Sequence, residues 1–143
     1  MSVEEPVSDD SLRLLIPSSI DRDWAWVEPL LEDMVSELRP DWTPDQIKNL
    51  IEENNAGLWT SWLGGFVITQ MNYNALLDQN YILMWISHAG NQPFDERDFI
   101  FIHQYAKDCD ARFVEIWSPR PGMARHMEKA GFEIVNTVIR RYL

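Results

Sequence analysis

The stretch RHMEKAGFEIV, residues 125–135, decides the fold of this chain. It reads as the last turns of a helix, a glycine that ends the helix and the start of a strand, close to the last residue of the sequence. Glycine is favoured just after a helix because it adopts a left-handed backbone without steric cost. The pattern predicts a helix over residues 120–130, a stop at Gly131 and a final strand over residues 132–143.

The N-terminal part of the chain reads as one short strand and two helices. An apolar run at residues 12–16 predicts the strand. Ser18 and Ser19 are candidate N-caps for a helix that runs to about Arg39, and Thr43 is the candidate cap of a second helix over residues 43–55. Apolar residues recur at helical spacing in both segments, so both helices are predicted to be amphipathic.

From residue 58 the apolar pattern changes to that of strands. The expected elements are strands at residues 58–62, 66–73, 81–89 and 112–118, with a helix at 93–110 and a hairpin turn at Gly64 and Gly65. The run at 81–89 is almost continuously apolar, which is typical of a central strand covered on both faces. The order is therefore β-α-α-β-β-β-α-β-α-β. We expect an α/β (α+β) fold with one domain over residues 11–143, preceded by a flexible acidic arm over residues 1–10.

Composition limits the class of protein. With 143 residues, 45% of them hydrophobic, the chain can form one globular domain. The formal charge is −11, and residues 1–60 hold 14 Asp or Glu against four Lys or Arg. Such a charge disfavours direct binding to nucleic acid or to anionic lipid. It fits a cationic partner, or it serves only to keep helix faces soluble. Seven tryptophans favour a protein partner at a Trp-rich or acidic surface.

Two further features of the sequence bear on metals and location. Cys109 is the single cysteine, and His88, His103 and His126 share no metal-ligand spacing, so no disulfide and no metal site is expected. No apolar run approaches 18 residues and no signal-peptide pattern is present, which predicts a cytoplasmic protein with no membrane span.

The element order, together with the ending MEKAGF before a last strand, resembles the GNAT (Gcn5-related N-acetyltransferase) family across essentially the whole chain. The resemblance implies a mixed, strongly twisted sheet in which the strands YILMWISHA and RFVEIWS separate to form a cleft. In the family this cleft holds acetyl-CoA, whose thioester is attacked by a substrate amine. Family members carry a glycine-rich turn before the helix that follows the first of these strands, and backbone N–H groups there bind the pyrophosphate.

The corresponding turn in this chain, GNQPFDERD at residues 90–98, departs from that pattern. Gly90 is its single glycine, Pro93 lacks an N–H donor, and three carboxylates would face the pyrophosphate. Acetyl-CoA, if it binds at all, would be held by Gly90, Arg97, Arg120 and Arg125. The alternative is an acidic helix cap in which Arg97 forms a surface ion pair.

The catalytic positions depart as well. The leaving-group tyrosine of the family falls on Met127, whose thioether cannot protonate a thiolate, and Arg120 occupies a place where many members have Asn. His88, at the end of one cleft strand, and Glu115, in the other, are the candidate general bases. A polar residue at a strand end can equally have a purely structural role.

The segments WISHAG and EIWSPRPGMARHMEKAGF also resemble the small GNAT-like proteins of tailed bacteriophages, in which the acetyl-CoA loop is often eroded. One hypothesis is a non-enzymatic interaction or structural protein with a degenerate site and no cofactor, in the cytoplasm or in a phage particle. The alternative is an acetyl-CoA-dependent N-acyltransferase for a cationic amine. A third idea is an inhibitor that imitates DNA and binds a host nucleic-acid-binding protein.

Overall fold

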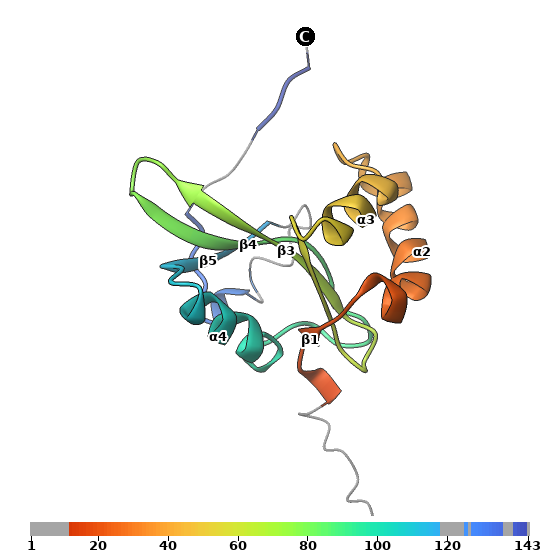
Figure 1. Ribbon diagram of the computed structural model, residues 1–143, viewed down its shortest axis with the longest axis horizontal. Helices are drawn as coiled ribbons and strands as arrows, with labels where there is room; N and C mark the ends of the chain where they lie inside the picture. The colour runs from red at the N-terminus through yellow and green to blue at the C-terminus, as the bar shows by residue number, and fades with distance from the viewer. Residues whose placement is uncertain (1–11, 118–124, 126, 136–138, 143) are drawn as a thin grey trace, which may run out of the picture.

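A computed structural model describes residues 12–117, 125, 127–135 and 139–142. In these residues a five-stranded mixed sheet has the order β1-β2-β3-β4-β5, with helices on both of its faces (Figure 1). The elements are β1 (Ile16–Pro17), α2 (Ile20–Leu38), α3 (Pro44–Glu52), β2 (Gly57–Thr60), β3 (Phe66–Asn74), β4 (Gln79–His88), η1 (Glu96–Phe99), α4 (Ile100–Asp108) and β5 (Phe113–Ile116). The predicted α/β class is confirmed, and so is the element order up to β5.

The two N-terminal helices begin at the predicted caps. The Ser19 side chain accepts a hydrogen bond from the Arg22 N–H at the start of α2. At the start of α3, Thr43 and Gln46 each bond the backbone N–H of the other, which is a complete capping box. Caps of this kind depend on residues three apart in the chain, which explains why the sequence alone located them.

The strands are joined in two ways. β2, β3 and β4 pair antiparallel, and Gly64, with φ of +81°, lies in the turn between β2 and β3. β5 pairs parallel with β4, and η1 and α4 form the connection between these two strands. A parallel pair needs such a crossover, since its second strand must start at the same end of the sheet as the first.

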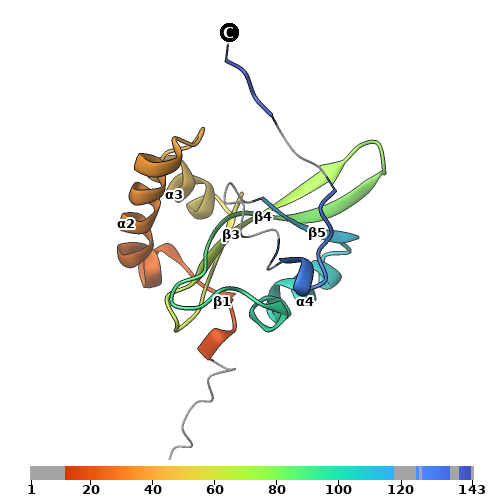
Figure 2. The same ribbon diagram turned by 180° about the vertical axis from the view of Figure 1, so that it is seen from behind.

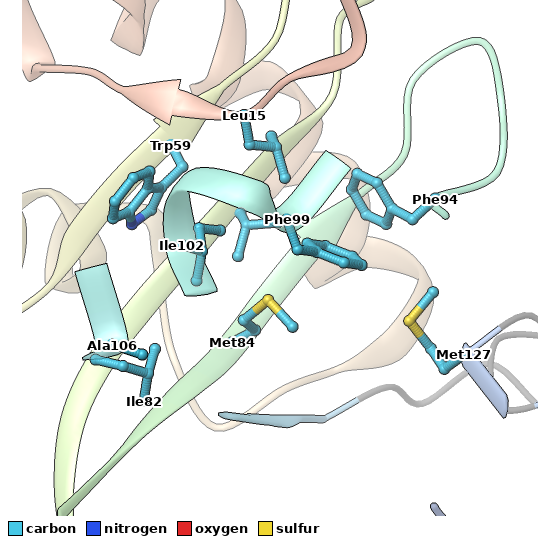
Figure 3. Close-up of a cluster of buried hydrophobic side chains, with 10 residues drawn as sticks. Leu15, Trp59, Ile82, Met84, Phe94, Phe99, Ile102, Ala106 and Met127 are labelled. Carbon is cyan, nitrogen blue, oxygen red and sulfur yellow. The ribbon is translucent and has the colours of Figure 1, made fainter. Parts of the chain in front are cut away.

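Apolar side chains form one core on each side of the sheet. One core lies between the sheet and α4, as Figure 3 shows, and the other lies between the sheet and the pair α2 and α3. Met127 is 3% exposed and belongs to the core beside α4, where Phe132 also packs. The helical residues 127–129 end at Gly131, whose φ is +91°. The predicted glycine stop is therefore confirmed for the residues that the structure describes.

The predicted final strand is wrong in its described residues. Residues 132–135 and 139–142 form no strand, and Ile134, Val135 and Ile139 are exposed. The sequence alternation gives strand propensity, but a strand forms only where a neighbouring strand supplies hydrogen bonds. The described end of the chain is instead held at the connection between α2 and α3, where Arg140 donates a hydrogen bond to Asp41.

At the other end of the chain the first strand is shorter than predicted. Leu12 and Arg13 are helical, and only Ile16 and Pro17 pair with β2. Pro17 has no N–H to offer, which suits an edge strand of two residues. The predicted acidic arm, residues 1–10, lies outside the described residues. Within the described part of the chain, no helix is both long and apolar enough to cross a membrane.

Candidate functional site

Strands β4 and β5 separate halfway along β4. Residues 81–84 pair with residues 113–116, and the N–H of Trp117 still donates to the Met84 carbonyl oxygen at 3.1 Å. Among the described residues, the rest of β4 pairs only with β3. This is the separation of strands that the GNAT resemblance implied, and both views of the ribbon show it beside α3 (Figure 2).

A β-bulge lies at the point of separation. Ile68 pairs with Ile86 and Thr69 pairs with Met84, so Trp85 is an extra residue in β4. A bulge places two consecutive side chains on the same side of a sheet. The side chains of Trp85 and Ile86 accordingly lie on the same face of the sheet, where both pack against the core of α2 and α3.

The bulge borders a hollow of about 770 Å³ between α3 and the sheet. Three indoles and four side-chain amides make up half of its described lining residues, and charged groups gather at the connection between α2 and α3. The lining residues are Arg39, Pro40, Asp41, Trp42, Gln46, Asn49, Leu50, Gln70, Asn72, Leu83, Trp85, Trp117, Arg140 and Tyr142. We call this site the Trp hollow.

The charged groups of the Trp hollow bind one another. Arg140 donates to Asp41, and the Tyr142 hydroxyl donates to the other Asp41 oxygen at 3.1 Å. The hydrogen bonds from Arg140 and Tyr142 lower the pKa of Asp41 below its ordinary value. Asp41, the only carboxylate among the described lining residues, is therefore ionised and already paired.

The turn at residues 90–98 is packed against the hairpin between β2 and β3. Gly90 has φ of +75°, and a Cβ there would lie 2.5 Å from the Leu63 carbonyl oxygen and 2.8 Å from the Gly65 nitrogen. The Asn91 N–H also points to the Leu63 oxygen, at 3.4 Å. Gly90 is required by contact with this hairpin, so its presence does not indicate a ligand.

Several N–H donors of the turn are satisfied within it. The Asp95 N–H donates to the Asp98 carboxylate at 2.6 Å, and the Arg97 N–H donates to the Asp95 carboxylate at 2.9 Å. This reciprocal cap opens η1 and continues into α4. These two N–H donors are therefore not available to a pyrophosphate.

Arg13, from the segment before β1, fills the centre of the turn. Its guanidinium donates to the Pro93 carbonyl oxygen at 3.1 Å, to Asp98 Oδ2 at 2.9 Å and to Gln92, and it forms an ion pair with Asp95 at 3.1 Å. Arg13 is 8% exposed and Asp98 is 5% exposed. Burial raises the pKa of Asp98, although its hydrogen bonds to the Asp95 N–H and to Arg13 act in the opposite direction.

Sequence reasoning missed Arg13. The signal that was present is charge balance, because a turn with three carboxylates needs a cation and Arg13 is the only Lys or Arg before residue 22. The distance of 85 residues between Arg13 and Asp98 in the chain hides their contact from any local pattern.

The predicted cofactor residues do not form a pyrophosphate site in the described part of the chain. Arg97 forms an ion pair with Asp95 at 2.8 Å, as expected if the turn is an acidic helix cap. Arg125 is helical and exposed. Arg120 lies outside the described residues. With Gly90 against the hairpin and Arg13 already bound to the acidic groups, this turn does not fit acetyl-CoA.

The two candidate bases lie apart. The His88 ring stacks on Phe66 with the centroids 5.7 Å apart, and Glu115 accepts a hydrogen bond from the Trp117 indole at 3.1 Å. Glu115 pairs with Leu83, five residues before His88 on β4, which separates the two backbones by about 16 Å. The described residues hold no group of three or more His, Cys, Asp or Glu that suits a metal ion.

Comparisons with solved structures agree with this architecture. A ribosomal-protein-alanine N-acetyltransferase from Brucella melitensis is 15% identical with a TM-score of 0.65, over 90% of this chain and 98% of that one. An aminoglycoside acetyltransferase from an uncultured soil metagenomic sample, solved with sisomicin, is 9% identical with a TM-score of 0.65, over 90% and 93%. An integron cassette protein from the mobile metagenome of a salt marsh is 13% identical with a TM-score of 0.66, over 96% of each chain.

No protein-family model matches the sequence, and no curated protein matches it significantly. The likeness to these solved structures, at such low identity, concerns the fold. The chain has the fold of the GNAT acetyltransferases, as the resemblance of its last helix and its element order implied.

Proposed function

We propose that this GNAT-fold domain is a non-enzymatic interaction or structural protein that does not bind acetyl-CoA. The observation that carries the proposal is the guanidinium of Arg13 inside the turn at residues 90–98. In place of a ligand's phosphates, the acidic turn binds a cation from its own chain.

The energetics of this ion pair favour the proposal. A pyrophosphate in the turn would have to displace carboxylates or draw Arg13 away from Asp98. Removal of one partner from a buried ion pair typically costs about 3–5 kcal/mol, since it leaves the other charge buried and unpaired. Binding energy for the cofactor would have to offset that cost before any affinity appeared.

The partner of such a protein is expected to be cationic. Residues 20–53, which include α2 and α3, hold ten Asp or Glu and three Lys or Arg, and most of these carboxylates are exposed. The tryptophans do not form one common surface. Trp24 and Trp59 are buried, Trp62 and Trp117 are exposed at different places, and three of the seven line the Trp hollow. The acidic face of α2 and α3 is therefore the surface that we propose for a protein partner.

An association with a phage particle is a finer form of the same proposal. It rests on the resemblance of the segments WISHAG and EIWSPRPGMARHMEKAGF to GNAT-like phage proteins. Mass spectrometry of purified particles from a host that carries the gene tests it: peptides of this chain in the particles support it, and their absence contradicts it.

The alternative function is an acetyl-CoA-dependent N-acyltransferase for a cationic amine. The separation of β4 and β5 beside the Trp hollow favours it, together with the acetyltransferase names of similar solved structures. Arg97 and Arg125, with Arg120, would then have to hold the phosphates, and His88 or Glu115 would have to accept the proton of the amine.

Calorimetric titration with acetyl-CoA, together with thermal melts, separates the two functions. A ligand at 100 times its Kd stabilises the folded state by about 2.7 kcal/mol. We expect no heat and no change in Tm at millimolar acetyl-CoA.

S-acetyl-pantetheine, which lacks the pyrophosphate, is the matched control ligand. Because it also lacks the adenosine 3′-phosphate, a micromolar Kd for acetyl-CoA that is lost with S-acetyl-pantetheine would mean that the protein holds the nucleotide and phosphate part of the cofactor, and the non-enzymatic proposal would then fail.

A further inference from the structure

We propose that the Trp hollow is a binding site for a carbohydrate, a neutral ligand of linked sugar rings. This inference goes beyond the proposed function and does not depend on it, because the hollow lies on the α3 side of the sheet and the turn at residues 90–98 contributes nothing to its wall. Three features of the lining carry it: indoles that stack on no other described aromatic ring, side-chain amides without a described hydrogen-bond partner and a neutralised carboxylate.

The three indoles come from three different elements. Trp42 lies in the connection between α2 and α3, Trp85 is the bulge residue of β4, and Trp117 follows β5. Among the described residues, none of the three stacks on another aromatic ring, whereas Trp26 and Trp59 each pair with one. Trp42 and Trp85 pack in part against the core of α2 and α3, and Trp117 is half-exposed, so the parts of these rings that line the hollow are available to a ligand. The C–H faces of sugar rings are apolar, and indoles combine an apolar face with an N–H donor. The indole N–H of Trp117 donates to Glu115, whereas those of Trp42 and Trp85 donate to no other described residue.

Four of the described lining residues of the Trp hollow have a side-chain amide. Asn49, Gln70 and Asn72 make no side-chain hydrogen bond to any other residue that the structure describes, while Gln46 is engaged in the cap of α3. A side-chain amide offers both a donor and an acceptor, and a hydroxyl group does the same. Neighbouring sugar hydroxyls can therefore be satisfied by these side chains without any charge.

The charges of the wall disfavour other ligands. Asp41 is bound to Arg140 and Tyr142, so no carboxylate of the described wall remains to attract a cation. Among the described lining residues, Arg39 is the one further charged residue. The chain carries a formal charge of −11, whose long-range field repels anions. A neutral ligand avoids both difficulties.

The size of the hollow agrees with an oligosaccharide. Ligand sites in proteins usually measure about 300–1,000 Å³ and combine a mostly apolar wall with a few polar groups. The Trp hollow measures about 770 Å³ and is open to solvent. It has room for more than one sugar ring.

Nuclear magnetic resonance of the indole N–H groups tests the proposal. The probes are maltotriose, cellotriose and tri-N-acetylchitotriose, each added up to about 10 mM, so that Kd values in the millimolar range are detected. We expect at least one of these sugars to shift the signals of Trp42, Trp85 and Trp117 and to leave that of Trp62 unchanged.

Two exposed tryptophans provide matched variants. The Trp117 side chain is 52% exposed and that of Trp62 is 75% exposed, so neither substitution should unfold the protein. We expect Trp117→Ala to weaken binding of the sugar about tenfold. Trp62→Ala, in the hairpin between β2 and β3, should leave it unchanged.

Three results would overturn the proposal. The first is that none of the three sugars moves the indole signals of the hollow. The second is an equal loss of binding in Trp62→Ala and Trp117→Ala. The third is a shift of the same three signals by choline or adenosine but by no sugar. Each of these readouts is separate from the titration with acetyl-CoA. A negative result for the sugars therefore leaves the proposed function unaffected, and binding of acetyl-CoA would not contradict a carbohydrate site.

Discussion

The turn at residues 90–98 follows the end of β4, and the Trp hollow borders the bulge in the same strand, yet the two differ in how their polar groups are satisfied. In the turn, carboxylates and N–H groups bond one another and Arg13, and the contact with the neighbouring hairpin leaves no space at Gly90. In the Trp hollow, three amides make no hydrogen bond to another described residue, and three indoles stack on no other aromatic ring of the described chain. This difference is the basis of the two proposals, that the turn does not bind acetyl-CoA and that the Trp hollow binds a carbohydrate.

The largest expected effect concerns the buried ion pair. Arg13→Met leaves Asp98 buried without its cation, which should lower the free energy of unfolding by about 3–5 kcal/mol. Urea denaturation measures the change. Arg97→Met is the matched control, because Arg97 pairs with Asp95 at a half-exposed position and its loss should change stability by about 0–1 kcal/mol.

The double variant Arg13→Met with Asp98→Asn sharpens this result. It removes the unpaired charge while an amide oxygen can still accept the Asp95 N–H, so it should be more stable than Arg13→Met alone. Equal stability of the single and double variants would mean that Arg13 acts by packing and not by its charge.

A second prediction concerns the contact between the turn and the hairpin. Gly90→Ala places a methyl group 2.5 Å from the Leu63 oxygen, and we expect a loss of about 3 kcal/mol. Gly64→Ala has a similar positive φ but nothing within 4 Å of the new Cβ, so its loss should be about 1 kcal/mol. Thermal melts of both variants give the comparison, and equal losses would contradict the close contact.

A third prediction is the order in which three carboxyl groups titrate. Burial raises the pKa of Asp98, whereas Arg97 lowers the pKa of Asp95 and Arg140 lowers that of Asp41. Carbon-13 carboxyl shifts should show Asp98 protonating at higher pH than the other two. Because the folded pKa of Asp95 lies below the unfolded value of about 3.9, its stabilising effect is present above that pH and is lost as the pH falls further. An Asp98 that titrates together with Asp95 would contradict a buried turn.

The smallest expected effect concerns the edge of the Trp hollow. Arg140→Ala removes an exposed ion pair with Asp41, so the free energy of unfolding should hardly change. The same variant frees the Asp41 carboxylate and should make the hollow more receptive to cations. Choline titration of both proteins measures this change, and equal binding of choline would mean that Asp41 has no influence on the hollow.

The sequence by itself determined the class of fold, the element order up to β5 and the ends of several helices. The caps at Ser19 and Thr43 and the stop at Gly131 depend on residues within about four positions of each other, so their chemistry is visible in a short stretch. The absence of a glycine-rich pyrophosphate turn was visible for the same reason.

Tertiary structure alone decided what fills that turn and where the Trp hollow forms. Arg13 meets Asp98 across 85 residues, and Trp42, Trp85 and Trp117 come together only after the sheet has formed with a bulge at Trp85. The final segment shows the same limit, since its alternating pattern predicted a strand that its described residues do not form. Close packing and pairing between distant segments depend on the whole fold, and no local spacing rule in the sequence contains them.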